Sequence, residues 1–364
     1  MEPPKQRGTT VSLPLRWLFL AILCMGTQPL YGQGERLRVV SYNVENLFDT
    51  QDDPGTDDEA FLKEGAFRWT EDKYYRKIKQ TAGVLADQGG WGYPALIGLV
   101  EVENQAVVRD LISHKSLRRQ HYRMAVSRGA DPRGVDVALL WHPWHFRQVA
   151  AYEIPHYGDL LYYPLRRDPR TQEERSGTGR STLWVVLESK KTGALLDVLV
   201  VHLPSRRGGV RATSVKRGEV CAKIHRVVDS IIEERETPRI LLMGDFNDTP
   251  TNVALKDSLQ TFAVSDAGGD YRPDRLYNLA IPLQERGEGT HVFGDEQWLP
   301  DQIIVSGALL NEQPGLYVDP PEQRVFSPEY LRQGRRPRRS FRGSRYSGSG
   351  FSDHFPVYID LIIN

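Results

Sequence analysis

The chain of 364 residues is long enough to bury a large core, and a composition of 40% hydrophobic and 26% charged residues is typical of a soluble globular protein. This composition excludes a chain that is mainly disordered or embedded in a membrane. The formal net charge at pH 7 is zero, so electrostatic attraction for an anionic partner must come from local clusters.

The N-terminus has the features of an export signal. Residues 17–26 are an apolar run of signal-peptide length, too short to span a bilayer comfortably, and Gly32 offers a cleavage site. We therefore expect residues 1–32 to be a signal peptide. The mature chain, without a transmembrane segment, would be periplasmic, extracellular or attached to the cell surface. Cys24 leaves a lipid anchor as an alternative, although Leu23 is larger than the residue that normally precedes a lipidated cysteine.

The mature chain has one cysteine, Cys221, so it can form no intramolecular disulfide and no thiolate zinc site. No internal repeat or linker divides residues 33–364, and strand patterns occur near both ends of this segment. We therefore expect a single domain over 33–364. No feature of the sequence indicates an obligate protein partner.

Short runs rich in β-branched and apolar residues, bounded by Gly, Pro or polar residues, predict buried strands. In chain order they are 37–44, 95–100, 135–141, 183–187, 195–201, 239–243, 302–305 and 355–361. Apolar stripes at helical spacing predict helices over 72–87, 105–112 and 213–235. This many strands with so few helices favours an α/β protein in which two sheets pack face to face with helices outside, rather than a doubly wound sheet.

Two segments are polar and without a strand or helix pattern. Residues 49–59 are rich in acids and could hold an additional structural ion such as Ca²⁺, but the spacing does not fit an EF-hand loop and a solvated loop is the simpler interpretation. Residues 332–345 contain seven arginines and no acid. Because like charges repel, we expect Arg335, Arg336, Arg338 and Arg339 to help hold phosphates of a substrate, with an ordinary solvated loop as the alternative.

Polar residues that can do chemistry lie at the ends of the predicted strands. They are Asn43, Glu101, His202, Asp245, Asn247, Asp301, Asp353 and His354. Each alone could serve a turn or a helix cap, but together they are typical of a site at one rim of a β-sandwich. Carboxylate and amide oxygens suit Mg²⁺ or Mn²⁺, and histidine transfers protons near neutral pH. The set favours metal-dependent cleavage of a phosphate ester over a serine triad.

The same residues, in order, resemble the signature of the endonuclease/exonuclease/phosphatase superfamily, which includes deoxyribonucleases, abasic-site endonucleases, neutral sphingomyelinases and inositol polyphosphate phosphatases. The resemblance spans about residues 37–362 and rests on Tyr42-Asn43, Val100-Glu101, Val201-His202, Gly244-Asp245-Phe246-Asn247, Asp301-Gln302-Ile303-Ile304-Val305 and Ser352-Asp353-His354-Phe355-Pro356-Val357. It implies a four-layered α-β-β-α sandwich of two mainly antiparallel sheets with outer helices. His202 makes the chain more similar to the deoxyribonuclease and sphingomyelinase branches, and the segments 46–49, 133–140 and 202–209 resemble exported bacterial members.

The resemblance also implies a role for each site residue. Glu101 would be the main metal carboxylate, with Asn43 beside it and Asp353 nearby. Asp245 would orient or deprotonate the attacking water, and Asn247 would hold that water or a phosphate oxygen.

The remaining roles concern proton transfer and substrate phosphate. His354 and His202 would be the two catalytic histidines, and Asp301 would orient one of them, which one being left open. Arg180 resembles a phosphate-contacting arginine of the family. Arg206 lies four residues after His202 and could also bind the substrate, since a guanidinium matches phosphate oxygens.

The leading hypothesis is a phosphodiesterase or nuclease that acts on nucleic acid or nucleotides. A phosphatase or a sphingomyelinase-type lipase is the alternative, and the lipase would need an apolar loop near the site, for which Trp91, Tyr93, Trp141 and Trp144 are possible pieces. A catalytically dead exported binding module is a third hypothesis, against which the complete set of acids and histidines argues. The sequence leaves open the substrate, endo or exo cleavage, monoester or diester preference, the number of metal ions and the oligomeric state.

Overall fold

The computed structural model describes residues 1–2, 34–89, 92–165, 179–206, 209–312 and 315–364. The chain divides into a unit of Met1–Gly34 and a compact unit of Glu35–Asn364. Apart from its first two residues, the predicted signal peptide lies outside the described residues. In the described part, no helix is both long and apolar enough to cross a membrane.

Two mixed, mainly antiparallel sheets form the centre of the Glu35–Asn364 unit. The first has seven strands, ordered β15-β21-β1-β2-β4-β3 with β16 also paired to β21: β1 (Glu35–Leu47), β2 (Leu96–Val102), β3 (Arg123–Val126), β4 (Asp136–Trp141), β15 (Leu316–Val318), β16 (Arg324–Val325) and β21 (Val357–Ile363). The second has eight strands, ordered β10-β11-β14-β9-β8-β7-β5-β6: β5 (Phe146–Pro155), β6 (Tyr163–Pro164), β7 (Ser181–Ser189), β8 (Leu195–His202), β9 (Ile240–Asp245), β10 (Thr261–Phe262), β11 (Leu276–Asn278) and β14 (Asp301–Ser306).

The three predicted helices begin and end close to the expected positions: α2 (Glu71–Asp87), α3 (Gln105–Ser113) and α4 (Val210–Glu234). The short α5 (Ile281–Glu285) was not predicted. Single helical turns lie at η1 (Glu59–Phe61), η2 (Arg118–Gln120), η3 (Ala254–Ser258), η4 (Val264–Ala267), η5 (Gly307–Leu309) and η6 (Glu329–Leu331). Three small hairpins complete the list: β12 (His291–Phe293) with β13 (Glu296–Trp298), β17 (Arg332–Gln333) with β18 (Arg336–Pro337), and β19 (Phe341–Arg342) with β20 (Arg345–Tyr346).

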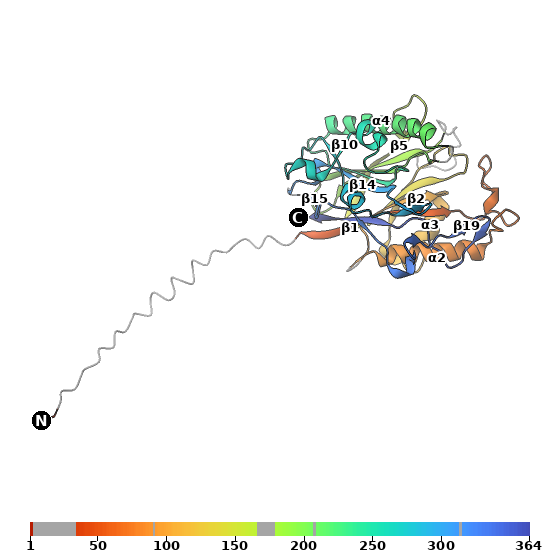
Figure 1. Ribbon diagram of the computed structural model, residues 1–364, viewed down its shortest axis with the longest axis horizontal. Coiled ribbons are helices and arrows are strands. Elements are labelled where there is room, and N and C mark those ends of the chain that lie inside the picture. The colour runs from red at the N-terminus through yellow and green to blue at the C-terminus, as the bar shows by residue number, and fades with distance from the viewer. Residues whose placement is uncertain (3–33, 90–91, 166–178, 207–208, 313–314) are drawn as a thin grey trace. The chain divides into compact units, whose positions relative to one another are not determined.

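Successive side chains of a strand point to opposite faces of its sheet, so each sheet packs on both sides and four layers result. Val39 of β1 packs between the sheets against residues such as Val198 and Met243, whereas its neighbour Val40 packs on the other face with Ile78 of α2. On the second sheet, the outer face packs against α4. Figure 1 shows α4 above the sheets and α2 and α3 below them. The predicted α-β-β-α sandwich is confirmed.

Strand register brings the predicted site residues to one rim. In the first sheet, β1 and β2 run parallel with Asn43 opposite Val100, so Glu101 follows at the same level. In the second, His202 at the end of β8 and Asp301 at the start of β14 both lie opposite Asp245, the last residue of β9.

Backbone irregularities concentrate at this rim. The pairing of β1 with β2 shifts between Asn43 and Leu47, and the pairing of β2 with β4 shifts around Glu101, whose φ is 64°. Such bulges redirect side chains beside functional sites, at a cost of about 1–3 kcal/mol for each strained residue. On β9, Gly244 has φ 144°, and a Cβ atom there would lie 1.9 Å from the carbonyl oxygen of Val201. Only glycine fits directly before Asp245.

We predict that Gly244→Ala lowers the free energy of unfolding by about 2 kcal/mol or more, because the added methyl group collides with backbone in an unfavourable conformation. Gly83→Ala is the control, since Gly83 is exposed within α2 and a Cβ atom there meets nothing within 4 Å. Helix propensity should make this control more stable by about 0.5–1 kcal/mol. Urea denaturation measures both, and a Gly244→Ala protein as stable as the wild type would refute the assignment.

Candidate active site

The two histidines predicted to be catalytic lie on either side of one carboxylate. Nε2 of His202 is 3.9 Å from Oδ2 of Asp245, and Nε2 of His354 is 3.9 Å from the same oxygen. His202 also lies 3.9 Å from Oε1 of Glu101, and His354 lies 3.9 Å from Oδ1 of Asp353. The structure therefore brings together five residues from four separate segments of the sequence.

Asp245 is fixed by two hydrogen bonds. Nδ2 of Asn43 donates to its Oδ2 at 3.1 Å, and the backbone amide of Asn247 donates to its Oδ1 at 2.8 Å. Burial raises the pKa of Asp245 to about 6, with smaller contributions in the same direction from Asp301 and Glu101, although His354 opposes this shift. A held carboxylate with this pKa is suited to accept a proton near neutral pH.

Asp301 orients His354, which answers the question left open by the sequence. Nδ1 of His354 lies 2.7 Å from Oδ2 of Asp301, and the hydroxyl of Thr290 donates to the same oxygen. Burial alone would lower the pKa of His354, but the charge and hydrogen bond of Asp301, with the charges of Asp245 and Asp353, raise it well above the ordinary value. These interactions favour the protonated form of His354, whose Nε2 lies 3.9 Å from Asp245 and Asp353.

The pKa of His202 is shifted in the opposite direction. It is buried, and its Nδ1 has no hydrogen-bond partner among the described groups. Burial lowers its pKa well below the ordinary value, and the nearby charges of Arg180 and Arg133 lower it further. The surroundings thus favour the neutral imidazole at His202 and the protonated one at His354, a pairing that separates acid and base roles.

The residues expected to hold a metal are hard oxygen donors. Oε2 of Glu101 accepts the amide of Asn46 at 3.1 Å, and Oδ1 of Asn43 accepts the amide of Glu45 at 3.0 Å, so both side chains are held in place. Two carboxylates, from Glu101 and Asp353, with an amide oxygen beside them, are a set that fits Mg²⁺ or Mn²⁺.

An anchored network behind Asp353 was not predicted. Arg339 donates to Oδ2 of Asp353 at 3.1 Å and to Oε1 of Glu45 at 3.3 Å. Buried Lys77 donates to the carbonyl oxygens of Val44 and Phe351 and to the hydroxyl of Ser340 at 2.6–2.8 Å. Burial raises the pKa of Glu45 to about 8. The position of Glu45, two residues beyond Asn43 at the same strand end, is the one sequence signal that could have identified it.

The arginine-rich segment is not the irregular loop that the sequence suggested, because it folds into the hairpins β17–β18 and β19–β20. Arg339 binds the site acids described above, and Arg336 pairs with Asp295 at 2.7 Å. Arg335 and Arg338 form no ion pair with the described residues. We expected these four arginines to act alike. Instead, acids of the protein pair with Arg336 and Arg339, whereas Arg335 and Arg338 keep their charges available for a substrate.

Arg180 and Arg206 lie at the rim, but both already have acidic partners. Nε of Arg180 lies 2.9 Å from Oδ2 of Asp131, and its Nη1 donates to the carbonyl oxygen of Leu203 at 2.6 Å. The same carbonyl accepts Nδ2 of Asn247 at 3.0 Å. This leaves Arg180 little freedom to follow a substrate.

Arg206 is held by different groups. Its guanidinium pairs with Asp248 and lies 4.7 Å above the ring of Trp298. Trp298 belongs to the hairpin β12–β13, which also carries His291. Both residues were missed because this hairpin has no run of apolar residues that would predict strands.

Because Asp301 is the main source of the raised pKa, we predict that Asp301→Asn lowers the pKa of His354 towards its ordinary value of about 6.5. NMR titration of ¹⁵N-labelled histidine in the presence of EDTA measures this. Asp319→Asn removes a carboxylate that pairs with Arg36 instead, and serves as the control. An unchanged His354 pKa in Asp301→Asn would contradict the assigned orientation.

Solved structures of other proteins share this fold. A structure of an endonuclease/exonuclease/phosphatase family protein from Bacteroides thetaiotaomicron superposes with a TM-score of 0.53 at 18% identity, covering 91% of this chain and 96% of that one. A structure of humanized D. rerio TDP2 superposes with a TM-score of 0.53 at 15% identity, covering 90% of this chain and 98% of that one. A mannosyl-6-phosphatase of Bacteroides thetaiotaomicron superposes with a TM-score of 0.51 at 16% identity, covering 90% of this chain and 100% of that one. At these identities the likeness shows the fold.

The family assignment comes from the sequence match. A comparison with curated proteins finds no match. The model of the Endonuclease/Exonuclease/phosphatase family matches residues 38–362, which includes every predicted site residue and nearly all of the compact unit. The chain belongs to the endonuclease/exonuclease/phosphatase family.

Proposed function

We propose that this protein is a divalent-metal-dependent phosphodiesterase, exported from the cell, that acts on nucleic acid or nucleotides. The observation that carries the proposal is that Nε2 of His202 and Nε2 of His354 both lie 3.9 Å from one oxygen of Asp245, in surroundings that lower the pKa of the first ring and raise that of the second. A hydrolase of phosphate esters needs an oriented water, a proton for the leaving oxygen and compensation for the phosphate charge.

Each need has a candidate group. Glu101 and Asp353, with Asn43, would hold the cation, which when bound neutralises charge on the phosphoryl oxygens. Asp245, with a pKa raised to about 6 by burial, orients the attacking water and accepts its proton. Asn247 lies beside it to hold the same water or a phosphate oxygen.

The histidines take the remaining roles. His354, kept cationic by Asp301, donates a hydrogen bond or a proton to the phosphoryl group. His202 stays neutral and lies between Glu101 and Asp245, where it accepts a hydrogen bond from substrate or water. The export part of the proposal rests on the apolar run at residues 17–26.

A lipase acting on membrane phospholipids has less support. Trp141 lies opposite Leu96, at the other end of β2 from Glu101, and is buried. The neighbouring loop with exposed Trp144 is tied to the same end, because the amide of His142 donates to the carbonyl oxygen of Ala95. These aromatic residues are therefore at the wrong end of the sheet to hold a lipid for this site.

We predict that Glu101→Gln lowers kcat/KM for bis-p-nitrophenyl phosphate by about 100-fold or more, because it removes a metal-ligand charge with little change in shape. Circular dichroism should show an unchanged fold, and high Mg²⁺ should restore part of the activity. Glu188→Gln is the control, since Glu188 lies opposite Leu195 at the far end of β8 from His202. Wild-type turnover of Glu101→Gln at low Mg²⁺ would exclude the assigned role.

A second prediction concerns substrate size. Replacing Arg335 and Arg338 with Gln should raise KM for oligonucleotides with little effect on kcat, and should flatten the salt dependence, because only a long substrate reaches both charges. The matched control is Arg118→Gln with Arg119→Gln, two exposed arginines shortly before β3, whose first residue Arg123 lies at the end of the sheet away from Glu101.

A panel with p-nitrophenyl phosphate, bis-p-nitrophenyl phosphate, oligonucleotides and sphingomyelin then decides among the activities. Faster cleavage of the monoester would favour a phosphatase over the diesterase. Equal kinetics of the Arg335/Arg338 variant and the wild type on every substrate would show that these arginines only solvate the surface.

A further inference from the structure

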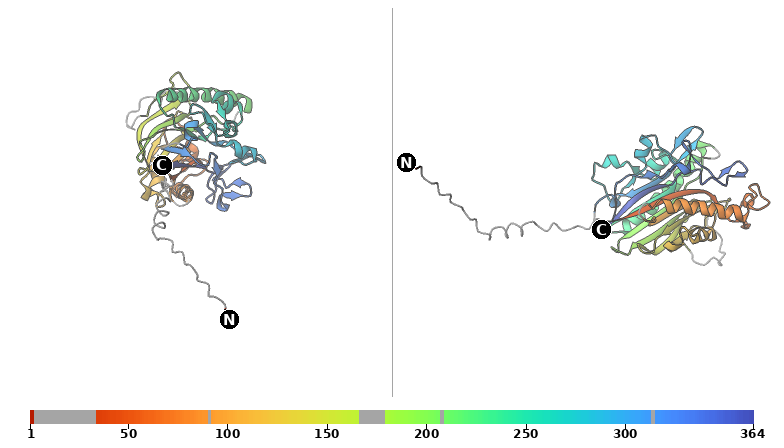
Figure 2. Two further views of the ribbon diagram at one scale, coloured as in Figure 1. Left: turned by 90° about the vertical axis from the view of Figure 1, so that its left-hand side faces the viewer. Right: turned by 90° about the horizontal axis from the view of Figure 1, so that it is seen from below.

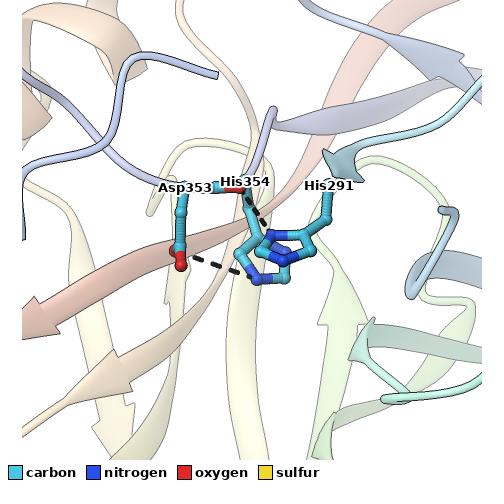
Figure 3. Close-up of side chains that lie close together, drawn as sticks. All are labelled: His291, Asp353 and His354. Carbon is cyan, nitrogen blue, oxygen red and sulfur yellow. Dashed lines mark hydrogen bonds and ion pairs between the residues drawn. The ribbon is translucent and has the colours of Figure 1, made fainter. Parts of the chain in front are cut away.

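A third histidine lies at the edge of the site and has no role in the proposed reaction. His291 comes from the first strand of the hairpin β12–β13, and its ring lies 4.6 Å from that of His354, with 34° between the ring planes. His291, His354 and Asp353 each offer one ligand atom, and these atoms lie within 4.8 Å of one another. Figure 3 shows the two rings side by side with the Asp353 carboxylate directed at them.

The hydrogen bonds determine which ring nitrogens are available. Nδ1 of His291 lies 2.7 Å from the carbonyl oxygen of Asp353, and because a carbonyl only accepts, this nitrogen carries the proton. Nδ1 of His354 is bound to the Asp301 carboxylate at 2.7 Å in the same way. Nε2 is therefore the nitrogen of each ring that remains available to a metal ion.

This is the arrangement of histidines that bind a metal. A ligating imidazole almost always donates its second N–H to a carboxylate or a backbone carbonyl, which fixes the tautomer and the ring orientation. Here His354 has the carboxylate partner and His291 has the carbonyl partner. Asp353 supplies the oxygen, and its Oδ1 lies 3.9 Å from Nε2 of His354.

The donor set also indicates the class of ion. Two imidazole nitrogens and one carboxylate suit Zn²⁺, Mn²⁺, Fe²⁺ or Co²⁺, whereas Mg²⁺ and Ca²⁺ prefer oxygen ligands. Sites with three protein ligands leave positions for water or substrate. The geometry points to a second metal site formed by His291, Asp353 and His354, which takes a divalent transition-metal ion and adjoins the magnesium site expected at Glu101.

The catalytic consequence rests on the proposed function. An ion at this site would take Nε2 of His354 in place of a proton and would itself compensate charge on the phosphoryl group, so the acid role of His354 belongs to the protein without this ion. Metal binding itself depends only on the three side chains, so it can be tested apart from hydrolysis.

The alternative is that His291 only anchors the Asp353 backbone, and two substitutions separate the roles. In His291→Asn the side-chain amide can still donate to the carbonyl oxygen of Asp353, but the second nitrogen is lost. His291→Ala loses both. If the residue is a ligand, both variants lose the site. If it is an anchor, only His291→Ala is affected.

The experiment is a titration of the metal-free protein with Co²⁺ in excess Mg²⁺, followed by visible absorption, with Zn²⁺ calorimetry as a second readout. The wild type should bind one Co²⁺ with the spectrum of an imidazole complex. Both His291 variants should bind it at least about tenfold more weakly, since a ligand is lost. Gln297→Ala, on the other strand of the same hairpin, should bind as the wild type does.

Two results would overturn the inference: no Co²⁺ binding by the wild type in excess Mg²⁺, or equal binding by His291→Asn and the wild type. Hydrolysis of bis-p-nitrophenyl phosphate with Mg²⁺ alone is measured on the same samples. Binding without hydrolysis would sustain the site and refute the phosphodiesterase. Hydrolysis without His291-dependent binding would refute the metal site and support the phosphodiesterase.

Discussion

Repulsion among carboxylates gathered at one rim is the constraint on which the site depends. Five of them, all buried or half-buried, lie there: Glu45, Glu101, Asp245, Asp301 and Asp353. Carboxylates removed from water need compensating positive charge. The contacts in this network supply three cations, from His354, Lys77 and Arg339, so negative charge remains in excess when all five acids are ionised. Burial, with smaller contributions from the charges of Asp301 and Glu101, raises the pKa of Asp245 to about 6.

The backbone at the rim maintains this unfavourable arrangement. Bulges at the ends of β1 and β2 place Asn43 and Glu101 at the site, and Gly244 lets β9 approach β8 closely enough to set Asp245 opposite His202. Strained positions of this kind persist only where the surrounding structure is stable. Here three apolar layers, one between the sheets and one beneath each set of helices, provide that stability.

Much of this could be predicted from the sequence, because buried strands have clear apolar patterns and the acids and histidines follow them directly. The failures have physical reasons. β5 was missed because Arg147, Gln148 and Glu153 interrupt its apolar residues. The hairpins within 332–346 have strands of two residues each, too short for a pattern, and form through tertiary contacts such as that of Lys77 with Ser340. The pairing of Asp301 with His354 and the approach of His291 exist only in the folded chain.

The excess of buried negative charge is the central claim, and thermal unfolding of the metal-free protein with and without Mn²⁺ or Mg²⁺ tests it most directly. A cation that binds only the folded protein stabilises it by about 2.7 kcal/mol when its concentration is 100 times Kd. We expect Tm to rise with either ion, to fall back on addition of EDTA, and to respond much less in Glu101→Gln. A Tm that is independent of both ions would contradict this explanation of the site.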